Sequence, residues 1–253
     1  MDEQICYKKP FLSEVIARID FASPIERLDK APPLKLVSTI VKSFPIIEPS
    51  DVLMQELAFD GNAVKTKQSA SKQWNYYSKE RDRQLALAPQ SVYVQYTRYS
   101  SYEKAKEEFG AVVNALNVAF PGTLASRFGL RYVNQIDLPV NDPTGWDDYI
   151  DAQLLCSRNF FEAADPMKRL ITVAELQYGD IGIRFQFGMP HPDYPARIRR
   201  PLFVLDLGAS VSEAHELADC MNYMDEAHAR IQPIFERSIT QTLRERMDAQ
   251  PIQ

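Results

Sequence analysis

Two neighbouring segments of this sequence restrict the fold more than any other feature. Residues 169–179 (RLITVAELQYG) and 180–189 (DIGIRFQFGM) have the composition of β-strands, and Gly179-Asp180 between them is a strong signal for a tight turn. A turn this short joins only antiparallel neighbours, because parallel strands need a long crossover connection. The sequence therefore predicts an antiparallel hairpin, which argues against an all-parallel sheet.

Three other segments have apolar residues at helical spacing. They predict helices over residues 34–44, 100–120 and 212–247, and Ser100 or Ser101 is suited to cap the second of them. Pro233 lies inside the last predicted helix. Proline removes a backbone hydrogen bond within a helix, so we expect a kink or a break at this position.

The remaining regular segments resemble short strands. Residues 11–22 alternate between apolar and polar side chains, which predicts an N-terminal strand. A meander of hairpins is the economical connection for the β-like runs that follow at 52–60, 73–80, 83–89 and 91–100. The predicted fold is α+β: an antiparallel, hairpin-rich sheet with two or three packing helices and a long kinked C-terminal helix.

The length of the chain allows one large core or two small ones. It has 253 residues, of which 45% are hydrophobic. Each half contains a hairpin-rich sheet segment and a packing helix, so we expect a single module over 1–253 with two interlocked halves, about 1–120 and 121–253. The start MDEQICYKKP lacks the pattern of a signal peptide and no apolar run is long enough to cross a bilayer, which predicts a cytoplasmic protein with no membrane partner.

Composition argues against several classes of function. The net charge of −5 gives no general attraction to phosphate backbones or anionic lipids. The three cysteines are scattered without C-x-x-C spacing, which is typical of neither a disulfide framework nor a zinc site. Neither glycine-rich phosphate-binding motif occurs. We expect no metal and no cofactor.

The central segment SRFGLRYVNQIDLP, residues 126–139, holds the most informative polar residues. Alternation along a strand places Arg127 and Arg131 on one face and Asn134 on the other, more apolar face. The two arginines are about 13 Å apart at about 3.3 Å per residue, too far to hold one small anion together. Pairing with carboxylates is favoured for both. For Asn134 we expect a structural hydrogen bond, because a buried amide needs partners.

Two further residues are candidates for chemistry. Asp206 lies between apolar residues in VLDLG and could ligate a metal, act as a base, cap the next helix or pair with Arg131; pairing is favoured. His228 lies beside the apolar stripe of the last helix, where a packing role is favoured over catalysis. The candidates for a ligand or partner site are thus Arg127, Arg131, Asn134, Asp206 and His228.

Two surfaces are candidates for larger partners. A proline-rich basic loop contains Arg197, Arg199 and Arg200, a weak signal for nucleic acid. The last helix is predicted to extend to residue 247, further than one sheet face requires. Its overhanging part would expose Ile239 and Leu243, so we expect a homodimer through these side chains.

Three stretches of the chain resemble a sporadically distributed, uncharacterised prokaryotic family of about this length. They are YKKPFLSEVIARIDF near the start, RFGLRYVNQIDLP in the middle and LFVLDLG…MDEAHARIQPIFERSITQTLRERM near the end, which include a G-L-R-Y-x-N block and an H…F-E-x-x-I-T helix. The resemblance spans nearly the whole chain and implies one full-length module but no activity. The patchy occurrence of the family suggests mobile or defence-associated genes. The family pattern points to Tyr7, Pro10, Arg127, Gly129, Arg131, Asn134, Asp206, His228, Phe235, Glu236 and Thr240.

The sequence favours a non-enzymatic role over an enzyme. Without a cofactor motif, a metal-ligand set or a nucleophile signature, we expect an interaction or regulatory subunit of a small operon-encoded complex, defence-associated if the resemblance holds. The alternative is an enzyme or a binder of a nucleotide or other small ligand, with a pocket lined by the five candidate residues. A second alternative is a nucleic-acid binder that uses the basic loop.

Overall fold

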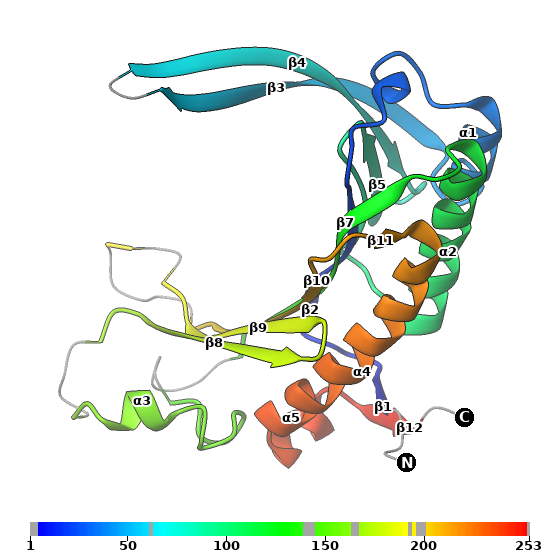
Figure 1. Ribbon diagram of the computed structural model, residues 1–253. Helices are drawn as coiled ribbons and strands as arrows, with labels where there is room; N and C mark the ends of the chain where they lie inside the picture. Colours follow the sequence, from blue (N-terminus) through cyan, green and yellow to red (C-terminus); the bar gives the residue numbers. More distant parts are fainter. Residues whose placement is uncertain are drawn as a thin grey trace. The chain divides into compact units, whose positions relative to one another are not determined.

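The computed structural model of the chain describes residues 5–60, 63–138, 145–162, 167–191, 194–195 and 201–251 (Figure 1). Its helices are α1 (Leu34–Ile40), α2 (Tyr102–Ala119), α3 (Cys156–Asn159), α4 (Cys220–Ser238) and α5 (Gln241–Arg246), with 3-10 turns at Glu26–Asp29 and Leu217–Asp219. Its strands are β1 (Ile5–Tyr7), β2 (Leu12–Phe21), β3 (Ile46–Asp60), β4 (Ala63–Tyr77), β5 (Arg83–Ala88), β6 (Ser91–Tyr96), β7 (Leu124–Ile136), β8 (Leu170–Tyr178), β9 (Ile181–Met189), β10 (Phe203–Val211), β11 (His215–Glu216) and β12 (Ala249–Pro251).

The strands form one ten-stranded sheet and one small ladder. The order in the large sheet is β3-β4-β5-β6-β2-β7-β10-β9-β8, and β11 pairs with the start of β7. The hairpins β3–β4, β5–β6 and β8–β9 are antiparallel, and β1 pairs with β12 in the separate ladder. The fold is α+β with an antiparallel, hairpin-rich sheet, which confirms the predicted class.

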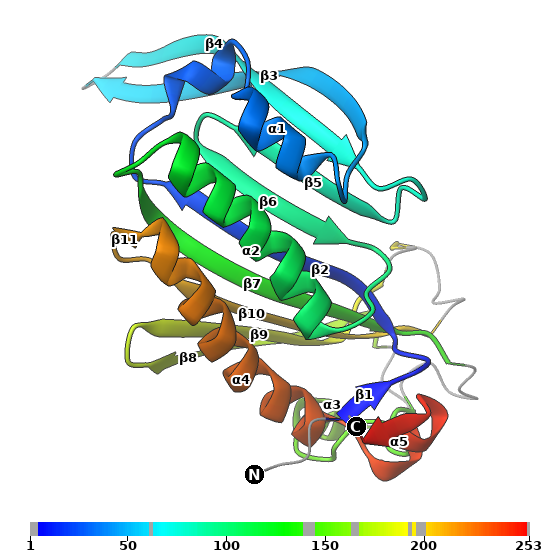
Figure 2. The same cartoon turned by 90° about the vertical axis from the view of Figure 1, so that its right-hand side faces the viewer.

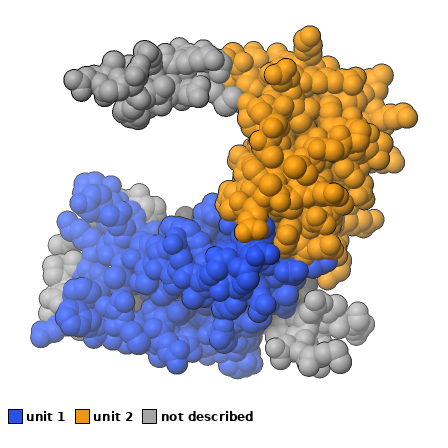
Figure 3. Space-filling model, in the orientation of Figure 1, with its two compact units in different colours: residues 1–15, 130–211, 225–253 blue, residues 16–129, 212–224 orange. Residues whose placement is uncertain are grey.

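The chain divides into two compact units, which Figure 3 colours separately. Unit 1 consists of Met1–Val15, Leu130–Val211 and Asp225–Gln253, and unit 2 of Ile16–Gly129 and Ser212–Met224. Each unit is therefore built from segments that are far apart in the sequence. The single module with a division near residue 120 stays a prediction.

Unit 2 has its core between its strands and two helices. Ala17, Ile19 and Phe21 of β2 are buried, as the alternation of this segment predicts. Helix α2 buries a stripe that includes Phe109 and Leu116. Figure 2 shows α1 and α2 across one face of the strands of this unit. The Ser101 side chain accepts a hydrogen bond from the backbone N–H of Lys104, so the predicted cap of α2 is confirmed.

Unit 1 is organised around the hairpin that the sequence signals most strongly. Tyr178 pairs with Ile181, so Gly179 and Asp180 form the two-residue turn, as predicted. Large apolar side chains of β9 and β10, among them Phe185 and Leu207, are buried on the side of the sheet that α4 crosses (Figure 2). Because every second residue of these strands is apolar, one face joins the core and the other remains polar.

The C-terminal segment departs from the sequence prediction at both of its ends. Residues 215–216 form β11, so the helical segment begins at Leu217 instead of residue 212. The helix α4 continues through Pro233 to Ser238, and a separate helix α5 follows after Thr240, whose side chain caps it. The predicted long C-terminal helix is present, but it ends at Ser238 and not at residue 247, because the chain turns at Ile239 to form a β-bridge with Ile150.

This turn removes the surface on which the predicted dimer depended. Ile239 is 3% exposed and Leu243 is 0% exposed, and both belong to the core of unit 1. The expectation that they overhang the fold is therefore wrong. Truncation after Arg237 would delete core side chains, so it should unfold unit 1 rather than release a folded monomer. A homodimer stays a prediction, but it requires another surface.

Candidate functional site

The strands of unit 1 have one face that is covered by α4 and one that is not. On β10, Leu205 and Leu207 are buried beneath the helix, while Asp206 and Gly208 point to the opposite side. Strand pairing places Gln186 and Val173 in one row with Asp206, and Arg184 and Glu175 in the next row with Gly208. We call this second side the open face, defined by Arg131, Ile171, Val173, Glu175, Gln177, Gly182, Arg184, Gln186, Asp206, Gly208 and Ser210.

An ion pair joins β7 and β10 on the open face. Nε and Nη2 of Arg131 donate hydrogen bonds to the two carboxylate oxygens of Asp206, each at 2.7 Å. The Asp206 side chain is 7% exposed, whereas that of Arg131 is 49% exposed. These hydrogen bonds raise the pKa of Arg131 above its ordinary value, so the guanidinium stays charged. The predicted pairing of Asp206 with Arg131 is confirmed.

This geometry fixes Arg131 but does not use all of its donors. A bidentate Arg–carboxylate pair holds the planar guanidinium in one orientation. Nη1 takes no part in the contact with Asp206, and half of the side chain remains in contact with solvent. The buried carboxylate therefore positions an arginine for which a further acceptor can come from outside the chain.

Charged groups of both signs surround this pair, and they include Glu14 of β2, whose negative charge also raises the pKa of Arg131. Arg184 on β9 lies directly opposite Glu175 on β8, and its Nη2 donates to the side-chain oxygen of Gln186 at 3.0 Å. Together with Arg131 and Asp206, the face carries alternating positive and negative groups. A balanced surface of fixed donors and acceptors resembles the polar part of a protein–protein interface more closely than an anion trap.

Two strand glycines of unit 1 differ in whether the backbone requires glycine there. Gly188 has φ +136°, and a Cβ there would lie 2.1 Å from the carbonyl oxygen of Leu170, so the fold requires glycine at this position. At Gly208 a Cβ would meet only ordinary contacts, 3.9 Å from the carbonyl oxygen of Arg184 and 4.0 Å from Cγ of Arg131. Nothing in the described residues makes glycine necessary at position 208. An interior strand glycine of this kind often marks close approach of a ligand or another backbone.

Asn134 and His228 lie on the covered side of the sheet. Asn134 is buried, and its side-chain nitrogen donates to the backbone oxygen of Leu205 at 3.4 Å, which confirms a structural hydrogen bond. His228 on α4 lies with Nδ1 3.2 Å from the hydroxyl of Tyr132. These side chains are satisfied inside unit 1 and do not share a face with Arg131 and Asp206.

Arg127 belongs to unit 2 and has a separate partner. One of its terminal nitrogens, Nη1, lies 3.7 Å from the carboxylate of Asp20, which also accepts a 2.7 Å hydrogen bond from Arg18. The ion pairing expected for Arg127 is thus confirmed. Of the five candidate residues, the structure brings Arg131 and Asp206 together on one face and Asn134 and His228 on the other, so the five do not line one pocket.

Several residues of the open face were not singled out in the sequence. Arg184, Gln186 and Glu175 are the clearest examples. The alternation in DIGIRFQFGM carries the signal, because Gly182, Arg184, Gln186 and Gly188 have one parity and the large apolar residues have the other. Alternation does not predict which of the two sets of side chains, odd-numbered or even-numbered, a helix will cover.

Arg197, Arg199 and Arg200 of the basic loop lie outside the described residues, so the loop stays a prediction.

His191 is 6% exposed, and within the described part of the chain neither of its ring nitrogens has a hydrogen-bond partner. Nothing that the structure describes explains this unpaired imidazole.

Residues to which the family pattern points form a packing cluster in unit 1. The hydroxyl of Tyr7 donates to Glu236 at 2.8 Å, and its ring meets Phe235 edge-on with 6.1 Å between centroids. Nε of Arg244 donates to the same carboxylate at 3.1 Å, and Thr240 donates to the backbone oxygen of Asp148 at 2.6 Å. Burial and the contact with Glu236 raise the pKa of Tyr7. These contacts tie the start of the chain to α4 and α5 and are structural.

Unit 2 has a separate apolar groove beside α1 and α2. It encloses about 640 Å³ and is lined by Leu34, Ala111, Ala115 and Val118, with Arg27 and Lys35 among its polar residues. Leu34 and Val118 are strongly exposed. The groove is an alternative surface against which the open face has to be tested.

In the ranges that the structure describes, no three His, Cys, Asp or Glu side chains are placed to hold a metal ion, and no helix there combines the length and apolarity needed to span a bilayer. No protein-family model and no curated protein matches the chain. The resemblance to the uncharacterised prokaryotic family stays a prediction.

Proposed function

We propose that this chain is a non-enzymatic interaction or regulatory subunit that binds a protein partner on the open face of unit 1. One observation carries the proposal: the buried Asp206 holds Arg131 in a fixed orientation. Beside this arginine lies Gly208, a strand position at which the backbone does not require glycine. Preorganised arginines are enriched in protein interfaces, and their hydrogen bonds cost little ordering on binding. Gly208 leaves room for a partner to reach the arginine.

The charge pattern favours a protein over a phosphate-rich ligand. Arg131 faces Asp206 and Arg184 faces Glu175, so the open face has no excess positive charge to attract a nucleic-acid backbone. A folded partner can match alternating charges with groups of opposite sign. We propose that a gene next to that of this chain encodes the partner, as expected for a small operon-encoded complex.

Site-specific photo-crosslinking tests where the partner binds. The full chain, carrying a photo-crosslinking amino acid at Gln186, is expressed together with the products of the adjacent genes. We expect a crosslink to one of these products from position 186 and none from position 118 in the groove of unit 2. A crosslink from position 118 alone would move the binding surface to the groove.

A steric variant tests whether the free space beside Arg131 is used. Gly208→Tyr fills that space with a residue that strands favour, so we expect the fold to remain and the affinity for the crosslinked product to fall at least tenfold. Asn117→Tyr on the exposed side of α2 is the matched control and should bind as the wild type does. If Gly208→Tyr folds and binds normally, the open face is not the interface.

A mobility-shift assay separates this proposal from nucleic-acid binding. Binding to DNA or RNA that is driven by phosphate contacts must weaken steeply as salt rises. We expect no shift at moderate salt. Salt-dependent binding that is lost when Arg197, Arg199 and Arg200 are replaced by alanine would favour the basic loop and a nucleic-acid partner instead.

A further inference from the structure

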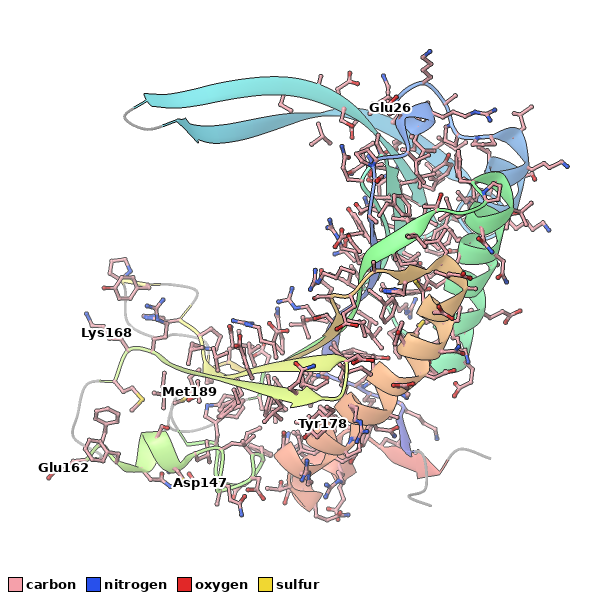
Figure 4. All side chains as sticks on the ribbon, in the orientation of Figure 1. Glu26, Asp147, Glu162, Lys168, Tyr178 and Met189 are labelled. Atoms are coloured by element: carbon pink, nitrogen blue, oxygen red, sulfur yellow. The ribbon has the colours of Figure 1, made fainter. Side chains whose placement is uncertain are left out.

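The outermost strand on one side of the large sheet, β8, has an unpaired edge. The strand order ends at β8, which spans nine residues (LITVAELQY) and pairs only with β9 among the described strands. Figure 4 labels Lys168 just before this strand and Tyr178 at its end. A strand of this length at an edge presents a row of backbone donors and acceptors to any chain that approaches it.

The hairpin turn determines which backbone groups face outward. In a two-residue hairpin the residues that flank the loop exchange hydrogen bonds with each other, and the pattern then alternates along the strands. Tyr178 and Ile181 are these residues here. The N–H and C=O groups of Ile171, Val173 and Glu175 therefore point away from β9. The described residues provide them with no backbone partner outside the ladder.

The side chains of β8 do not protect this edge. Ile171 and Val173 on the open face are 36% and 46% exposed, and Leu176 and Tyr178 on the other side are 43% and 38% exposed. Protected edges usually carry charged side chains, above all lysine, or proline or a bulge; LITVAELQY contains neither lysine nor proline, and Glu175 is its single charged residue. An edge with exposed apolar side chains on both faces is typical of a strand that another strand covers.

We propose that β8 pairs with β8 of a second copy of this chain, antiparallel about a twofold axis at Thr172. In this register Ile171 lies opposite Val173 of the second copy, so the exposed aliphatic side chains cover each other. Arg169, which precedes the strand, lies opposite Glu175 of the second copy. Both Arg169 and Glu175 are exposed in the single chain.

Charge selects this register over its neighbours. An axis at Val173 places Glu175 opposite Ile171, and an axis at Ala174 places Glu175 opposite Val173. An axis at Glu175 places two like charges directly opposite each other, which destabilises a strand pair. Only the axis at Thr172 pairs Arg169 with Glu175 twice, once on each side of the axis. An isologous pairing of this kind closes after two copies, so the product is a dimer and not a fibre.

This inference goes beyond the protein partner proposed for the open face and does not depend on it. A homodimer through β8 uses the backbone edge of the sheet and the open-face side chains of that edge strand, whereas the proposed partner contacts Arg131 on β7, three strands away. Gly208→Tyr should therefore leave the dimer intact, and loss of the dimer does not require loss of the partner.

A proline substitution at the outward-facing backbone tests the dimer directly. Light scattering of the full chain at micromolar concentration should give the mass of a dimer. Val173→Pro removes an N–H that β9 does not use, so the chain should stay folded by circular dichroism and become monomeric. Val173→Thr keeps the N–H and is the matched control, which should remain dimeric. A monomeric wild type, or a dimer that survives in folded Val173→Pro, overturns the proposal.

A charge swap tests the register and does not depend on the proline variant. Glu175→Arg places like charges opposite each other, so the dissociation constant should rise about tenfold. The double variant Arg169→Glu/Glu175→Arg restores opposite charges and should return the dissociation constant to near the wild-type value. If Glu175→Arg has no effect, or the double variant is no better than the single one, the register is wrong.

Discussion

Neighbouring residues of strand β10 lie in opposite environments, because one side of the strand is covered by α4 and the other is not. Leu205 and Leu207 are fully buried beneath α4, whereas Asp206 and Gly208 line the open face. On the covered side, polar groups such as Asn134 and His228 have partners inside the chain. On the open side, Arg131 is fixed by Asp206 but half exposed. The polar residues of the covered face thus have hydrogen-bond partners inside the folded chain, whereas Arg131 on the open face keeps donors that face solvent.

The largest difference between the two faces should appear at adjacent residues of β10. Leu207→Ala leaves a cavity under α4 and should lower the free energy of unfolding by about 2 to 5 kcal/mol. Gly208→Ala adds a methyl group that would make only ordinary van der Waals contacts, so the free energy of unfolding should change by no more than about 0.5 kcal/mol. Urea denaturation of both variants measures the two values. Equal losses would contradict the division into a covered and an open face.

The ion pair should respond unequally to loss of its two members. Arg131→Ala leaves the buried Asp206 carboxylate without its partner and should cost about 3 kcal/mol. Asp206→Ala leaves an arginine that water can solvate, so the expected cost is about 1 kcal/mol. Thermal denaturation at neutral pH compares the two. The reverse order would mean that Arg131, and not Asp206, is the member that the fold buries.

Asn134 tests whether the polar groups of the covered face are structural. Asn134→Ala removes a single long hydrogen bond to the backbone of Leu205, so we expect a loss of about 1 to 2 kcal/mol and no effect on partner binding. Chemical denaturation and the crosslinking assay are the two measurements. A binding defect in a variant of unchanged stability would place Asn134 in the functional surface.

A pair of tyrosines on β4 extends the comparison to unit 2, with a loss of stability that begins only at alkaline pH. Tyr76 is buried and Tyr77 has the opposite parity, and burial raises the pKa of Tyr76 from 10.0 to about 12. The neutral phenol is therefore favoured in the folded chain. Its contribution to stability is complete below pH 10 and is lost as pH rises to 12.

Alkaline denaturation checks this expectation. The free energy of unfolding of the wild type should fall between pH 10 and 12. That of Tyr76→Phe should fall less steeply over the same interval, because this variant has no phenol to ionise at position 76. Tyr77→Phe is the control. If both variants follow the wild-type curve, burial does not set the ionisation of Tyr76.

Features that depend on local chemistry could be predicted from the sequence. The turn at Gly179-Asp180 and the cap at Ser101 rest on a few adjacent residues and are confirmed. The pairing of Arg131 with Asp206 follows from strand parity and from the cost of burying an isolated carboxylate. The α+β class follows from the order of these elements.

Features that depend on distant partners could not be predicted. Residues 215–216 were assigned to a helix because Ser212 and Glu213 suit a helix start, but they pair with the start of β7. Strand β4 includes the polar stretch at 63–72, which has no apolar alternation and is held as a strand by its pairing with β3. The five candidate residues were assigned to one pocket because sequence alone does not say which side of a strand a helix will cover.

The division of each unit into separated segments has a consequence for the order of synthesis. The part of unit 2 at 16–129 leaves the ribosome early but lacks β11 and the 3-10 turn at Leu217–Asp219 until residues 212–224 follow. Unit 1 begins with β1 and waits for residues 225–251 to supply most of α4, and then α5 and β12. Both units therefore finish folding only when nearly all of the described chain has been made. Until then their strands remain open to wrong pairing, so this protein should depend on chaperones more than a fold built from contiguous domains.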